Sequence, residues 1–235
     1  MEIRYTSIQR KPSHEALPSG KIRIYYNEIE STETASHRDE ESGEETEETY
    51  PVYLYRVADA DSLTRDAIIV ALIRAEYSAD DELAIQRQKD EKPLEYSEYS
   101  AYVEWCKAYS LRVLHGDTLD TAKAIKVAES GQYDASPEVN TFYIGNAATW
   151  LSPAARSNYL LTIQAAQAAG VETVIFEGVT LPVADALAAL NAINIYAMQC
   201  VGVTEAHKAN ILALESVADV ERYDFTVGYP EKLHF

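Results

Sequence analysis

The sequence FYIGNAATWLSPAA, from Phe142 to Ala155, decides the fold of the C-terminal half. The pair Gly145-Asn146 stands between two short runs that end at Ile144 and Trp150, which predicts a tight β-hairpin. Ser152 followed by Pro153 predicts the start of a helix, and Gly170 predicts its end. This stretch therefore indicates a hairpin followed by a helix.

A second unit of the same kind follows, in the sequence TVIFEGVTLPV from Thr173 to Val183. It predicts a hairpin that turns at Glu177-Gly178 and a helix from Pro182 to about Val201. A separate last helix is expected up to Leu214, followed by an aromatic tail that is expected to dock on a surface that the sequence does not identify. We predict an α+β domain over residues 118–235, with the two hairpins in one small antiparallel sheet and both helices on one face.

The N-terminal region, residues 1–60, is expected to form antiparallel strands. The runs Ile3–Ile8, Lys21–Ile29 and Pro51–Val57 have the alternation or the Tyr and Val content that is typical of strands. Between them, residues 30–48 are dominated by Asp and Glu and contain almost no apolar side chains. This composition predicts a solvated loop, and its contiguous glutamates do not match the spacing of a calcium loop.

The middle region, residues 61–117, is expected to be helical. Apolar residues recur at three- and four-residue steps from Ser62 to Tyr77, and Ser78 precedes a second helix as an N-cap. Lys92-Pro93 interrupts that helix, and a third is expected from Glu95 to Leu114. The next domain is expected to open with a helix from Leu119 to Glu129 that ends before Gly131.

The composition is that of an ordinary globular protein, and the negative net charge makes nucleic acid an unexpected partner. The 235 residues are 47% hydrophobic and 25% charged, with 38 acidic side chains against 20 basic ones and a formal charge of -18. Because nucleic-acid phosphates are bound by clustered Lys and Arg, direct nucleic-acid binding is not expected. The uncharged stretch from Ala186 to Thr204 contains Asn and Gln on a helical apolar pattern, which favours a core helix over a membrane span. No signal-peptide pattern opens the sequence.

The sequence lacks the motifs of catalytic, cofactor and metal sites. Its five histidines form no zinc motif, and His207 is expected to be structural or solvent-facing. Cys106 and Cys200 stand in helical apolar patterns that are typical of buried, inert thiols. Neither a nucleophile elbow nor a glycine-rich phosphate loop occurs. We therefore expect no enzymatic activity, no cofactor and no metal.

Tyrosine is unusually frequent among the aromatic residues, with 17 Tyr against four Phe and two Trp. Tyr offers a large contact area with a polar tip, and interfaces favour it, although half-buried core edges use it as often. The candidate interface residues are Tyr53, Tyr55, Tyr96, Tyr99, Tyr102 and Trp150.

Several C-terminal elements resemble a known family. They include Thr149-Trp150-Leu151-Ser152 with Arg156, Leu181-Pro182-Val183, and Val203-Thr204-Glu205-Ala206-His207-Lys208-Ala209. These residues, within positions 123–215, resemble the C-terminal domain of unknown function in tailed-bacteriophage and prophage proteins that are associated with tail fibres. The helical stretch from Leu63 to Lys107 is similar to the middle of such proteins. The resemblance implies no active site. It implies a place in the virion or the bacterial host cytoplasm.

We expect a phage tail or tail-fibre structural or assembly protein that acts by protein–protein contacts, as a homo-oligomer or in a complex with other tail proteins. An acidic inhibitor that mimics DNA to block a host nuclease is the alternative, and it predicts charge spread along one face rather than concentrated in one segment. A glycan hydrolase is a further alternative, which needs two carboxylates held apart across a cleft.

Overall fold

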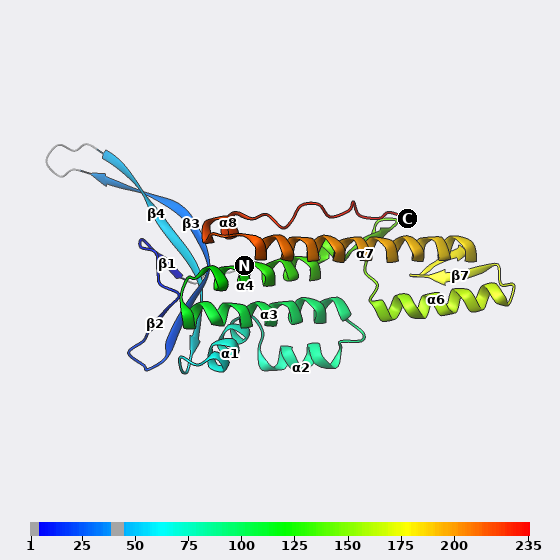
Figure 1. The fold of residues 1–235 in the computed structure, drawn as a ribbon, viewed down its shortest axis with the longest axis horizontal. Coiled ribbons are helices and arrows are strands. Elements are labelled where there is room, and N and C mark those ends of the chain that lie inside the picture. The colour runs from blue at the N-terminus through cyan, green and yellow to red at the C-terminus, as the bar shows by residue number, and fades with distance from the viewer. Residues whose placement is uncertain (1–4, 39–44) are drawn as a thin grey trace. The chain divides into compact units, whose positions relative to one another are not determined.

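The computed structural model describes residues 5–38 and 45–235, and its architecture confirms the α+β class (Figure 1). An antiparallel sheet is built from the N-terminal strands, and helices with two small hairpins make up the rest. In chain order the elements are β1 (Tyr5–Ser7), β2 (His14–Ala16), β3 (Ile22–Arg38), β4 (Glu45–Ala60), α1 (Arg65–Glu76), α2 (Ala79–Arg87), α3 (Pro93–His115), α4 (Leu119–Ala135), α5 (Pro137–Asn140), β5 (Phe142–Ile144), β6 (Ala147–Thr149), α6 (Pro153–Ala168), β7 (Thr173–Phe176), β8 (Val179–Pro182), α7 (Val183–Ala213) and α8 (Val217–Arg222).

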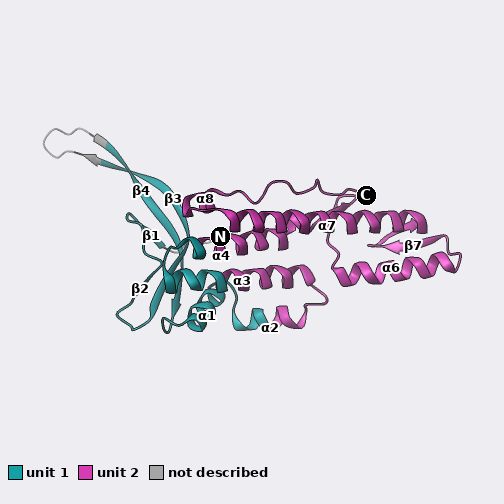
Figure 2. Cartoon of the chain, in the orientation of Figure 1, with its two compact units in different colours: residues 1–82, 106–121 teal, residues 83–105, 122–235 magenta. Residues whose placement is uncertain are grey.

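The chain forms two compact units (Figure 2). Unit 1 contains residues 1–82 and 106–121, and unit 2 contains residues 83–105 and 122–235. Both units are therefore discontinuous in sequence. The expected three-part division, at residues 60 and 117, stays a prediction.

The sheet of unit 1 has the strand order β1-β4-β3-β2, with antiparallel pairing throughout. The ladder between β3 and β4 shifts its register between Tyr26 and Ile29, where Asn27 has a φ of 50°. Asn tolerates this left-handed conformation better than most residues, as a β-bulge requires. Helix α1 packs against β4 and buries Ile68 and Leu72.

The acidic segment is mostly strand, so the predicted loop over residues 30–48 is wrong for the part that the structure describes. Residues 30–38 belong to β3 and residues 45–48 to β4, while residues 39–44 lie outside the described residues. The register places no two acidic residues of the described segment opposite each other: Glu30 faces Tyr53, Glu33 faces Tyr50, Glu47 faces Ser36, Glu48 faces Ala35, and Glu45 is paired with Arg38. Since like charges directly opposite destabilise a sheet, this register lets an acidic sequence form a ladder.

The two predicted hairpin–helix units are present in unit 2. The hydroxyl oxygen of Ser152 accepts a hydrogen bond from the backbone N–H of Ala155 at 3.0 Å, and Pro153 opens α6. The hairpins, however, form separate two-stranded sheets, β5-β6 and β7-β8, so the prediction that they join in one sheet is wrong. Each hairpin instead contributes a buried phenylalanine, Phe142 or Phe176, to one core that also includes Leu190 of α7.

Two helices run further than predicted. Helix α7 continues from Val183 to Ala213 as one element of 31 residues, where a break near Val201 was expected. Within it, Thr204, a poor helix former, is accommodated with its hydroxyl oxygen 3.1 Å from the carbonyl oxygen of Cys200, one turn earlier. Similarly, α4 continues through Gly131 to Ala135, since a single glycine lowers helix stability without ending the helix.

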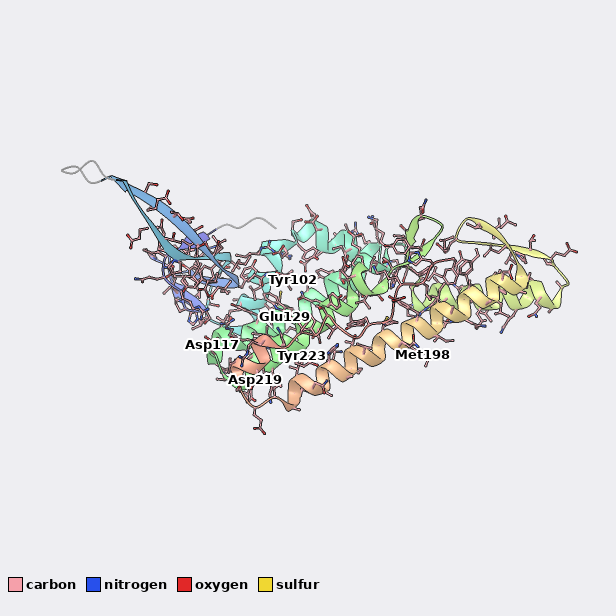
Figure 3. All side chains as sticks on the ribbon, turned by 90° about the horizontal axis from the view of Figure 1, so that it is seen from above. Tyr102, Asp117, Glu129, Met198, Asp219 and Tyr223 are labelled. Atoms are coloured by element: carbon pink, nitrogen blue, oxygen red, sulfur yellow. The ribbon has the colours of Figure 1, made fainter. Side chains whose placement is uncertain are left out.

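By length and composition, α7 is the one helix among the described residues that could cross a membrane. Its most apolar window has a mean hydropathy of 1.5, and 33% of that window is buried within the chain. A core helix passes the same test, so this finding is weak evidence for a span. Ile195 and Met198 are exposed on this helix. Met198 is labelled in Figure 3.

The C-terminal tail docks as predicted, and the surface that it contacts is part of unit 2. The backbone N–H groups of Tyr143 and Gly145 donate to the carbonyl oxygens of Leu233 and Phe235, both at 2.9 Å. His234 forms a parallel bridge with Tyr143, and the two rings stack with their centroids 4.7 Å apart. The tail thus pairs along β5.

Candidate functional site

The six predicted interface residues are divided between the units. Tyr53 and Tyr55 are in unit 1, and Tyr96, Tyr99, Tyr102 and Trp150 are in unit 2. Tyr55 is 2% exposed and Tyr99 is 8% exposed. These two side chains are therefore buried within their units, as the core alternative for the tyrosines predicts. The remaining four are half-buried, and their role at an interface stays a prediction.

Tyr55 is held in an aromatic cluster of unit 1. Its ring packs edge-on against Tyr25 at 5.5 Å, and Tyr5 packs against the other side of Tyr25 at 5.2 Å. The Tyr55 hydroxyl donates to Glu28 at 3.0 Å and accepts from the backbone N–H of Lys11 at 2.8 Å. Burial raises the pKa of Tyr55. The cluster therefore fastens the segment between β1 and β2 onto the sheet.

Beyond this cluster, the hairpin of unit 1 continues as two strands alone. Strand β1 pairs with β4 from Tyr53 to Tyr55, and β2 pairs with β3 from Ile22 to Ile24. We call the remainder, residues 30–38 of β3 and 45–52 of β4, the β-arm (Figure 1). Among the described residues, no third strand pairs with it. Both of its edges therefore offer free backbone hydrogen-bonding groups.

The β-arm is largely exposed on both faces, with Val52 at its base buried. On one face, the hydroxyls of Thr34 and Thr49 lie 3.1 Å apart across the ladder. On the other face, the Tyr50 hydroxyl donates to Glu33 at 3.5 Å. An isolated two-stranded ribbon is marginally stable in water, so contacts with another surface would stabilise it.

Unit 2 contains a pocket of about 440 Å³, which we call the Arg156 pocket. Two of the predicted residues, Tyr96 and Trp150, line it, whereas Tyr99 and Tyr102 do not. Instead, Tyr102 stacks on Trp105 with the centroids 5.7 Å apart. The volume is within the range of roughly 300–1,000 Å³ that is typical of small-molecule sites.

The Arg156 guanidinium is the main charged group that the sequence analysis missed as a site residue. Its Nε atom is buried and forms no hydrogen bond or ion pair with any described residue. Burial lowers its pKa, because desolvation disfavours the charged form. A sequence signal was present: Arg156 stands in the first turn of α6, where the helix dipole disfavours a cation.

Asp134 also lines the pocket, but it already has a partner. Its Oδ1 atom accepts a hydrogen bond from the Thr204 hydroxyl at 2.7 Å. The Thr204 oxygen also lies 2.8 Å from the Tyr229 hydroxyl in the tail. Asp134 therefore links α4, α7 and the tail.

The chain has no match among protein-family models, curated proteins or solved structures.

His207 holds the tail to α7 and is structural, as expected. Its Nε2 atom is 2.8 Å from the carbonyl oxygen of Val227, and its Nδ1 atom is 2.8 Å from the hydroxyl of Tyr223. The carbonyl can only accept, so Nε2 carries the proton, and Nδ1 of the neutral ring accepts from Tyr223. Both contacts fix residues that follow α8.

The thiols and carboxylates of the described residues do not gather into a metal site. No group of three or more His, Cys, Asp or Glu side chains occurs there with the geometry to hold an ion. Cys106 and Cys200 are buried, as predicted, and burial raises the pKa of Cys200. The β-arm and the Arg156 pocket are therefore the two features that we consider further.

Proposed function

We propose that this protein is a structural or assembly protein that acts by protein–protein contacts, with the β-arm as its main contact element. The observation that supports this most is the arm itself: two paired strands continue beyond the four-stranded part of the sheet with both edges unpaired among the described residues. Extended partners bind to such edges by strand addition, in which backbone hydrogen bonds supply much of the affinity.

The charge of the β-arm suggests the partner's chemistry. Glu30, Glu33, Glu47 and Glu48 are all exposed. Their mutual repulsion opposes pairing between the arms of two copies, which is how edge strands avoid aggregation. A partner with a basic surface beside an exposed strand would complement the arm.

The context that we propose is a phage tail or tail fibre, with the protein in the virion or the bacterial host cytoplasm and without enzymatic activity. This context rests on the resemblance of positions 149–209 to tail-fibre-associated proteins. The acidic DNA mimic gains less support, because the four described carboxylates of the arm are divided between its two faces.

The test is the mass of the purified protein in solution, measured by light scattering with and without the products of neighbouring genes. We expect a stable homo-oligomer or a complex of fixed composition. A matched variant replaces residues 33–50 with Asn-Gly, which closes the ribbon after the pair of Thr32 with Pro51. It should keep its far-UV circular dichroism and lose the complex. A monomer without a partner, or a variant that assembles as well as the natural chain, would contradict the proposal.

A further inference from the structure

The Arg156 pocket has a cation that is not neutralised by the protein. The chain has a formal charge of -18, so carboxylates are abundant. Some other cations of unit 2 have carboxylates as partners: Lys208 lies 2.8 Å from Glu205, and Arg222 lies 3.0 Å from Asp219. Arg156 has no such partner among the described residues, although its Nε atom is buried. Arg156 is half-buried as a whole, and a partly desolvated charge without a partner carries a cost that an external anion would offset.

The start of α6 adds to the positive potential beside Arg156. This helix has 16 residues and no acidic side chain in its first turn. Ser152 and Pro153, at its N-terminus, line the same pocket as Arg156. Its first N–H groups are largely used, because Pro153 has none and that of Ala155 is bonded to Ser152, so the contribution here is the partial positive charge of the helix N-terminus, which favours an anion.

The remaining walls are mostly apolar and aromatic. Phe142, Trp150, Leu151 and Ile193 line the pocket together with Tyr96. A second hollow of about 530 Å³ shares Arg156 with it and continues along α7 to Met198. Apolar walls around a single cation are suited to an organic ligand with one charged end.

Asp134 restricts the charge of that ligand. It lines the pocket and keeps its carboxylate in a hydrogen bond with Thr204. A second negative charge on the ligand would be repelled by Asp134 in this partly desolvated space. A monoanionic carboxylate, which matches the fork of a guanidinium, is therefore favoured over a phosphate.

We propose that the Arg156 pocket binds a monocarboxylate with an apolar or aromatic body. The carboxylate accepts hydrogen bonds from the Arg156 guanidinium, and the body lies against Trp150 and Phe142. This site is independent of the assembly role, since the β-arm belongs to unit 1 and the pocket to unit 2.

The test is calorimetric titration of the full chain with a panel of carboxylates: acetate, octanoate, 3-phenylpropionate and indole-3-acetate, each beside its neutral amide. We expect at least one of the three larger acids to bind with one site per chain and a Kd of about 1 mM or tighter. Its amide should bind at least about tenfold more weakly, because a charge-assisted hydrogen bond is lost. Acetate should bind most weakly, because it has almost no apolar surface to bury in the pocket. Binding should also change the fluorescence of Trp150.

Two arginine variants separate recognition of the carboxylate from a general loss of charge. Arg156→Gln should weaken binding of the acid at least about tenfold and leave binding of the amide unchanged. Arg222→Gln removes an exposed arginine at the end of α8 and should bind the acid like the natural chain.

Three results would overturn the proposal. One is the absence of binding by every acid in the panel up to about 10 mM, well above the Kd expected here. Another is equal affinity for acids and amides. The third is an equal loss of affinity in the two arginine variants. If Arg156→Gln does not fold, Ala197→Phe tests the same pocket by filling it, and undiminished binding by that variant also contradicts the assignment.

Discussion

The hydroxyl of Tyr109 donates a hydrogen bond to the backbone carbonyl oxygen of Tyr25, 84 positions earlier in the chain, at 2.5 Å. The donor lies on α3 and the acceptor on β3, just before the bulge at Asn27. Tyr109 is 4% exposed, and burial raises its pKa. This contact joins the second segment of unit 1 to its sheet at a place where the ladder is irregular.

Replacing Tyr109 by Phe should therefore destabilise unit 1. The change leaves the carbonyl of Tyr25 without its buried donor, which costs about 1–3 kcal/mol of unfolding free energy. Tyr50→Phe is the matched control, because the Tyr50 hydroxyl forms a long, exposed hydrogen bond to Glu33. We expect less than about 0.5 kcal/mol there. Urea denaturation followed by circular dichroism measures both, and equal losses would contradict the assigned role.

The ion pair of Arg23 and Asp59 should stabilise the sheet at neutral pH and not in acid. The guanidinium donates two hydrogen bonds to the carboxylate, at 2.8 and 2.9 Å, across adjacent strands. The hydrogen bonding with Arg23 keeps the pKa of Asp59 below its ordinary value of 3.8. The stabilisation is therefore present above the unfolded-state pKa and is lost as pH falls through the lower, folded-state pKa.

Asp59→Asn measures that pH dependence. Near pH 7 we expect the variant to be less stable than the natural chain by about 0.5–1 kcal/mol, the scale of a partly exposed pair. The difference should decline below about pH 4 and vanish once the carboxyl is protonated. Asp61→Asn is the control, because Asp61 is 87% exposed and lies 3.2 Å from Lys21. A difference that grows in acid would exclude the stated cause.

Local signals in the sequence predicted the local elements, and the failures arose where distant residues decide the outcome. Ser152-Pro153 and the hairpin turn at Glu177-Gly178 carry backbone preferences of their own, so both were predicted correctly. The acidic segment was assigned by composition, whereas its pairing depends on the register that places Glu33 opposite Tyr50. The Arg156 pocket draws its walls from segments that are distant in sequence, so the place of Arg156 in the first turn of a helix could single out that residue but not the pocket around it.

The register of the β-arm predicts opposite effects of two charges at one position. Ala35 lies directly opposite Glu48. Ala35→Glu places like charges across the ladder and should weaken the arm by about 0.5 kcal/mol, whereas Ala35→Lys should strengthen it by a similar amount. The hydrogen-exchange rates of the backbone amides in the β-arm, measured at low ionic strength, should rise in Ala35→Glu and fall in Ala35→Lys. If both variants shift exchange in the same direction, the register is not the one described.

Two glycines should respond in opposite ways to alanine. Gly178 has a φ of 77° in the turn between β7 and β8, while Gly131 lies within α4. An added Cβ would meet nothing within 4 Å at either position, so the difference comes from the backbone alone. Gly178→Ala should cost about 1–2 kcal/mol, and Gly131→Ala should gain about 0.5–1 kcal/mol. Thermal unfolding of both variants checks the two signs.

Replacing Arg156 should affect the stability of the ligand-free protein. A side chain whose role is to bind a ligand does not have to stabilise the protein when the ligand is absent. The Nε atom of Arg156 is buried without a partner, so Arg156→Met removes a desolvated charge and keeps most of the apolar length. We expect the unfolding free energy of the ligand-free chain to rise by about 1 kcal/mol. Arg222→Met, at an exposed ion pair with Asp219, should change it by less than about 0.5 kcal/mol. A loss of more than about 1 kcal/mol in Arg156→Met would identify Arg156 as a structural residue instead.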